Sequence, residues 1–127
     1  MINSIHHIAI ICSDYTFSKH FYSEVLGFKI LAENYRADKN SWKLDLQIND
    51  QTNIELFSFI NSPERLSYPE AVGLRHICFS VEDLEEVIKK LKLKGIVFEE
   101  IRIDEYTDKK FVFFEDPDGL PIELYEK

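Results

Sequence analysis

The sequence HIAIICSD at residues 7–14 recurs as HICFSVED at residues 76–83, an offset of 69 residues. Two more segments repeat at an offset of 68: LGF at residues 26–28 corresponds to KGI at 94–96, and IELF at 54–57 corresponds to IELY at 122–125. Because this register holds from the beginning to the end of each copy, we interpret the chain as two diverged copies of one structural unit.

Each copy predicts the same order of elements. A β-branched run is followed by an aspartate suited to cap a helix, Asp14 or Asp83. Apolar residues at helical spacing come next, and then Gly27 or Gly95 stands where a helix ends in left-handed geometry. The predicted helix faces are Phe17, Phe21, Tyr22, Val25 and Leu26 in the first copy, and Leu84, Val87, Ile88 and Leu91 in the second. The predicted strands are residues 5–12, 28–36, 42–49 and 53–60, then 74–81, 96–103, 110–115 and 121–126.

These elements predict an α+β fold of two tandem βαβββ modules. A chain of 127 residues can bury one substantial core but is short for two ordinary domains, so we expect a single domain over residues 1–127. Module 1 covers approximately 4–60, module 2 approximately 74–127, and a connector of residues 61–73 holds two of the four prolines. With both helices on one side of the sheets, the other side would be a concave groove.

Composition restricts the partners. The net charge of −8 repels nucleic-acid backbones and anionic lipid, so neither is an expected partner. No apolar run approaches the ~20 residues of a membrane helix, and the N-terminus has no leader pattern, so we expect a cytoplasmic protein. Cys12 and Cys78 form no CxxC pair, which argues against a disulfide framework or a thiolate metal site. The remaining expectation is a small-molecule substrate and, because open sheets leave strand edges unpaired, a homodimer.

Side-chain alternation along the strands brings two histidines and two glutamates to the face away from the helices. These four residues are His7, Glu55, His76 and Glu123. A carboxylate in mid-strand between apolar neighbours is unfavourable unless it is paired, protonated or metal-bound, and both copies carry one. Two imidazoles and two carboxylates suit Zn or Ni, and also Co, Mn or Fe(II). The pattern therefore predicts one divalent metal ion per site.

Each of these residues has a simpler explanation when taken alone. A strand histidine is more often a satisfied core residue than a ligand, and a strand glutamate usually faces solvent. The matched recurrence in both copies favours the metal site over these readings. His6 is the alternative ligand to His7, although alternation turns it toward the helix side, and His20 is expected to be solvated.

Several residues on the groove face are candidates for substrate binding. The substrate-binding candidates are Phe57, Phe59, Lys43, Asp45 and Phe113. Cys78 shares its face with His76 and is a weaker candidate for the pocket lining, whereas Cys12 is expected to pack in the core. The arginines lie in loops or at strand ends, where solvated charges are the more common outcome. These are Arg36, Arg65, Arg75 and Arg102.

The motifs HHIAIICSD, FYSEVLGF, IELF, LRHICFSVED and DPDGLPIEL together resemble the vicinal oxygen chelate superfamily, and glyoxalase I in particular, from His7 to Glu126. Within that superfamily the chain is similar to the small bacterial glyoxalase-like proteins of the YaeR type, through SWKLDL, IELFSF, SPER and GLRH. The resemblance implies that His7, Glu55, His76 and Glu123 are the metal ligands. It also implies that Glu123, or else Glu55, transfers a proton during catalysis.

The resemblance implies a lyase that binds its substrate through two adjacent oxygens and isomerises it by way of an enediolate-like intermediate. Glyoxalases that use glutathione adducts carry an arginine and an asparagine where this chain has Ile11 and Phe59, which argues against that substrate. Two other readings stay open: an Fe(II) dioxygenase or thiol transferase, in which Glu55 would be dispensable for metal binding, and a non-catalytic small-molecule-binding protein.

Overall fold

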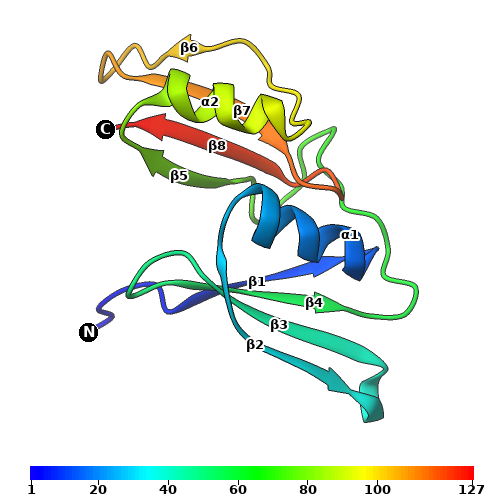
Figure 1. Ribbon diagram of the computed structural model, residues 1–127. Coiled ribbons are helices and arrows are strands. Elements are labelled where there is room, and N and C mark those ends of the chain that lie inside the picture. The colour runs from blue at the N-terminus through cyan, green and yellow to red at the C-terminus, as the bar shows by residue number, and fades with distance from the viewer. The chain divides into compact units, whose positions relative to one another are not determined.

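A computed structural model describes all residues, 1–127 (Figure 1). It contains two four-stranded sheets with one main α-helix each, so the predicted α+β fold of tandem modules is confirmed. The chain divides into two compact units, Met1–Glu64 and Arg65–Lys127, which are described separately below. No helix is both long enough and apolar enough to cross a membrane.

The first unit follows the predicted order of elements. Its sheet has the strand order β1-β4-β3-β2, with β1 parallel to β4 and the other pairs antiparallel. Its elements are β1 (His7–Cys12), α1 (Tyr15–His20), the π-helical turn η1 (Phe21–Val25), β2 (Lys29–Arg36), the 3-10 turn η2 (Ala37–Lys39), β3 (Ser41–Gln47) and β4 (Asn53–Ser58).

The second unit repeats this arrangement. Its sheet has the strand order β5-β8-β7-β6, and β5 is parallel to β8. Its elements are β5 (Ile77–Val81), α2 (Leu84–Leu93), β6 (Arg102–Ile103), β7 (Lys110–Glu115) and β8 (Pro121–Glu126). Figure 1 shows one helix against each sheet, and the contacts place α1 on β4 and α2 on β8.

The core of each unit lies between its helix and one face of its sheet. The alternate residues Leu44 and Leu46 of β3, and Ile54 and Leu56 of β4, are fully buried. In the second unit Val112, Phe114, Ile122 and Leu124 occupy the same positions. Because alternate strand residues point to opposite faces, the residues between them lie on the face away from the helix.

Both helices begin and end as predicted. Asp14 caps α1 and accepts a hydrogen bond from the Phe17 N–H, and Asp83 caps α2 and accepts one from the Glu86 N–H. Gly27 and Gly95 have φ values of 81° and 93°, in the left-handed region that favours glycine.

The prediction that Phe17 lies on the buried face of the first helix was wrong. The buried residues of α1 and η1 are Ser18, Phe21, Tyr22 and Val25, whereas Phe17 is 59% exposed. The buried stripe runs at i, i+3, i+4 and i+7 from Ser18, so Phe17 lies one residue outside it. A small hydroxyl therefore takes the core position that hydrophobicity alone assigned to an aromatic ring.

The strand predicted at 96–103 is present but much shorter, since only Arg102 and Ile103 form the regular ladder with β7. The Glu99 N–H donates to the Phe113 carbonyl, and the ladder resumes at Arg102 opposite Phe111. The segment from Glu99 to Arg102 is thus one residue longer than the segment of β7 that it faces, from Phe113 to Phe111. An extra residue of this kind disrupts a ladder, and it leaves the segment beside β7 without regular pairing.

Candidate metal and substrate site

In the first unit, a histidine and a glutamate lie together on the face of the sheet away from α1. His7 opens β1 and Glu55 lies in the middle of β4, the strand paired in parallel with β1. Their side chains approach with His7 Nδ1 3.5 Å from Glu55 Oε2. The His6 ring also contacts the His7 ring, at 3.0 Å between the two Nδ1 atoms. His6 precedes β1, so its side chain does not have to point to the face opposite His7.

Polar groups surround this first pair. Lys43 Nζ lies 3.0 Å from Asp45 Oδ1 and 3.9 Å from Glu55 Oε1. Asp45 is the cross-strand neighbour of Glu55, and Lys43 is the neighbour of Phe57. The Phe57 and Phe59 rings stack with centroids 6.0 Å apart, and the Arg36 guanidinium lies over both. Four of the substrate-binding candidates thus share a face with Glu55.

In the second unit, the equivalent pair is closer. His76 Nε2 lies 3.1 Å from Glu123 Oε1. Here the cross-strand neighbour of Glu123 is Phe113, in place of the aspartate of the first unit, and the Phe113 ring meets the His76 ring edge-on at 5.1 Å. The two pairs therefore have the same backbone positions but different surroundings, one charged and one aromatic.

Cys78 lies beside Glu123 in the paired strands and is exposed. Although the residue is exposed, its thiol is partly shielded from solvent, and this desolvation, the Glu123 charge and a hydrogen bond to that carboxylate raise the pKa of Cys78 to about 11. The thiol of the metal-free chain is therefore protonated at neutral pH. Cys12 is buried, as predicted.

The two pairs fit a divalent metal ion in ligand type and in separation. Two donor atoms that each lie about 2.1 Å from one zinc ion are roughly 3.0–3.4 Å apart at octahedral or tetrahedral angles. The separations of 3.1 Å and 3.5 Å in the two units are close to this range. No group of three or more histidine, cysteine, aspartate or glutamate side chains that could hold a metal occurs in the structure. Each unit by itself therefore offers one histidine and one glutamate of the predicted set.

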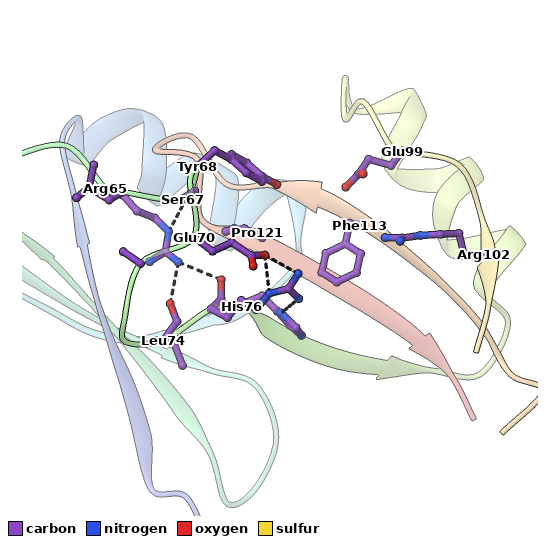
Figure 2. A pocket seen from close by; sticks show the side chains of 13 residues that line it. Arg65, Ser67, Tyr68, Glu70, Leu74, His76, Glu99, Arg102, Phe113 and Pro121 are labelled. Atoms are coloured by element: carbon purple, nitrogen blue, oxygen red, sulfur yellow. Dashed lines mark hydrogen bonds and ion pairs between the residues drawn. The ribbon is translucent and has the colours of Figure 1, made fainter. Parts of the chain in front are cut away.

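A cavity of about 180 Å³ lies beside His76 within the second unit (Figure 2). Phe113 is the only substrate-binding candidate from the sequence that lines it. Much of its wall is the chain segment Arg65–Arg75, most of which was predicted to be a connector outside the core. The lining residues are Arg65, Leu66, Ser67, Tyr68, Glu70, Ala71, Leu74, Arg75, His76, Glu99, Arg102, Phe113 and Pro121.

Hydrogen bonds hold this segment against the second sheet. Arg65 donates from Nε to Ser67 Oγ and from Nη2 to the carbonyls of Leu74 and Arg75. Ser67 in turn donates to the Gly119 carbonyl, in the turn before β8. Sequence reasoning missed this role because it depends on main-chain carbonyls, which leave no pattern in the sequence. The SPER motif at residues 62–65 was the one available signal.

The chain is similar to known proteins over nearly its whole length. Residues 4–124 match the model of the Glyoxalase/Bleomycin resistance protein/Dioxygenase superfamily. The chain is 53% identical to the uncharacterized protein YaeR of Escherichia coli over 99% of this chain and 98% of that protein. It is 54% identical to the uncharacterized protein YwkD of Bacillus subtilis over 100% and 99% of the two chains.

More distant relatives carry named activities. The metallothiol transferase FosB of Staphylococcus saprophyticus is 32% identical over 98% of this chain and 78% of its own length. Among solved structures, a glyoxalase family protein from Enterococcus faecalis superposes with a TM-score of 0.90 at 52% identity, covering 97% of both chains.

Proposed function

Since the chain belongs to the Glyoxalase/Bleomycin resistance protein/Dioxygenase superfamily, we propose that it is a metal-dependent lyase of the glyoxalase I type. The observation that carries the proposal is the histidine–glutamate pair that each unit forms independently, at 3.5 Å and 3.1 Å. We propose that His7, Glu55, His76 and Glu123 hold one divalent ion, with zinc or nickel preferred and cobalt, manganese or Fe(II) as alternatives.

The bound metal would supply Lewis acidity toward two adjacent substrate oxygens. We assign the proton transfer to Glu123, because its neighbours His76 and Phe113 line the cavity and a substrate there would be within reach. Glu55 is the second candidate. Lys43 and His7 approach its carboxylate from two sides, which favours a fixed ligand over a group that must detach to carry a proton.

A thiol transferase is the alternative that one observation favours, namely the 32% identity to the metallothiol transferase FosB. The two reactions differ in their products. Isomerisation of a thiol adduct leaves the substrate's atoms unchanged in number, whereas thiol transfer joins a free thiol to an electrophile. Mass spectrometry of reactions with α-oxoaldehyde adducts and with epoxides plus thiol separates them. If the metal-loaded protein converts none of the α-oxoaldehyde adducts and none of the epoxides, the proposal that the protein is an enzyme is contradicted.

We expect little turnover of the hemithioacetal that methylglyoxal forms with glutathione. Ile11 and Phe59, 55% and 38% exposed, offer apolar surface where the glutathione-using enzymes resembled by the sequence have polar anchors. A charged tripeptide loses hydration there without gaining hydrogen bonds, so we expect kcat/KM at least about 100-fold below the 10⁴–10⁸ M⁻¹s⁻¹ typical of enzymes. Spectrophotometric assay of the metal-loaded protein measures this directly. Turnover within that range would show that the two substitutions are unimportant.

We expect a homodimer in which each metal site takes one histidine–glutamate pair from each chain. The exposed sheet edges favour self-association, and the duplicated units allow either pairing of sites. The test mixes a His7→Ala variant with a His76→Ala variant and allows subunits to exchange. If the sites are shared, a heterodimer has both substitutions in one of its two sites and none in the other. One site of each heterodimer should therefore bind metal again. If verified exchange restores no metal, each chain builds its own site.

A further inference from the structure

The cavity in the second unit contains more positive than negative side chains, although the chain as a whole has a net charge of −8. Arg65, Arg75 and Arg102 line it, opposed by Glu70 and Glu99. His76, the proposed metal ligand, lines the same cavity. Which of these charges are already neutralised decides what kind of ligand the cavity would accept.

Arg75 and Arg65 already form ion pairs or hydrogen bonds with other residues of the cavity wall. Arg75 forms an ion pair with Glu70, at 2.7 Å from Nη2 to Oε1, so their charges cancel. Arg65 donates its hydrogen bonds to main-chain carbonyls and to Ser67, as described above. Arg65 keeps its positive charge, since no carboxylate pairs with it, but its donors are largely used.

Arg102 is different, because neither a carboxylate nor any other hydrogen-bond acceptor engages its guanidinium. The guanidinium lies over the rings of Phe111 and Phe113, with its carbon 5.0 Å and 5.5 Å from the two centroids. Contact with aromatic faces orients a guanidinium without using its N–H donors, which lie in the guanidinium plane. Glu99 lines the same cavity but forms no ion pair with Arg102. Arg102 thus keeps a positive charge and its free donors at the cavity wall.

Phe113 connects this guanidinium to the proposed metal site. Its ring contacts the His76 ring at 5.1 Å and the Arg102 guanidinium at 5.5 Å, and Figure 2 shows it between the two. The guanidinium carbon is therefore at most 10.6 Å from the centre of the imidazole, the sum of these distances. A small molecule can span that separation.

We propose that the substrate carries an anionic group, a carboxylate, phosphate or phosphonate, and that Arg102 binds this group. The inference rests on the proposed function, because it assumes that the metal-binding end of the substrate lies at His76. The planar fork of arginine donors matches all three oxyanions. A cavity of about 180 Å³ is smaller than the usual range for ligand pockets, which favours a small acid over an adduct of a tripeptide.

Calorimetric titration of the metal-loaded protein tests this with three hydroxamates, which bind metals through two adjacent oxygens. Acetohydroxamate has no second charge, succinohydroxamate adds a carboxylate, and 3-phosphonopropanohydroxamate adds a phosphonate. We expect at least one charged probe to bind about tenfold or more tightly than acetohydroxamate, as a charge-assisted hydrogen-bond pair to arginine provides. The better of the two charged probes shows whether the site prefers a carboxylate or a tetrahedral phosphorus oxyanion.

The variant Arg102→Gln should reduce that preference to about twofold or less while leaving acetohydroxamate binding unchanged. Arg102→Lys should retain part of it, since the charge remains but the fork is lost. Lys92→Gln is the matched control: it removes the same charge from an exposed position on α2 outside the cavity, and should keep the wild-type preference.

The outcomes separate the two proposals. Equal binding of all three hydroxamates to the wild-type protein, or an equal loss of preference in Lys92→Gln, overturns the role of Arg102 while the metal site stands. Failure of the protein to bind metal or acetohydroxamate overturns the proposed function itself.

Discussion

The variant His76→Ala is expected to lose most of the divalent metal that the wild-type protein binds. His76 approaches Glu123 at 3.1 Å, and its loss removes one of the four proposed ligands together with the partner that orients this carboxylate. Mutations of outer groups that merely orient ligands already lower metal affinity by about 10–100-fold, and removal of a ligand should do at least as much. Glu55→Gln in the first unit is expected to act in the same direction, because a neutral amide is a weaker ligand than a carboxylate.

Elemental analysis after dialysis against a weak chelator measures this loss. We expect close to one ion per chain in the wild-type protein and less than about a tenth of that in His76→Ala. His20→Ala is the matched control, because His20 is an exposed histidine at the end of α1 with no contact to either pair. Unchanged metal content in both His76→Ala and Glu55→Gln contradicts the four-ligand site. Loss in His76→Ala with retention in Glu55→Gln supports a three-ligand site of the thiol transferase or dioxygenase kind.

The variant Leu56→Ala is expected to lower the free energy of unfolding by about 2–5 kcal/mol. Leu56 is fully buried in β4, on the face covered by α1, and lies between Leu44 and Ile10 in the sheet. Truncation removes apolar contacts and leaves a cavity that the close-packed neighbours fill only in part. Its position also adjoins Glu55, which points to the opposite face of the same strand.

Denaturant titration measures this change, with Ile11→Ala as the control. Ile11 is a similar aliphatic residue on the neighbouring strand, but it is 55% exposed, so its truncation should change the free energy of unfolding by less than about 1 kcal/mol. Equal losses of unfolding free energy in the two variants would contradict the assignment of the buried and exposed faces of this sheet. They would also contradict the placement of His7 and Glu55 on the exposed face.

The sequence by itself determined the repeated unit and its face assignment. The matched segments at 7–14 and 76–83 recur because two copies of one fold need the same strand and helix cap, and both aspartates do cap their helices. Strict alternation in a strand leaves no freedom over which face a residue takes, so Glu55 and Glu123 could be assigned to the face away from the helices. The metal preference of the proposed ligands follows from their residue types alone, which is why a metal could be proposed without coordinates.

Tertiary structure alone decided the features that depend on the main chain of distant segments. The extra residue between Glu99 and Arg102 ends the regular pairing with β7, and no side-chain pattern encodes such a shift of register. The wall of the cavity is formed by a segment that reads as a linker, because Arg65 binds carbonyl groups that every residue possesses. Arg102 looked like a solvated strand-end charge in the sequence. Only the positions of Phe111 and Phe113 on the neighbouring strand, which orient its guanidinium without using its hydrogen-bond donors, make it a candidate for binding the substrate.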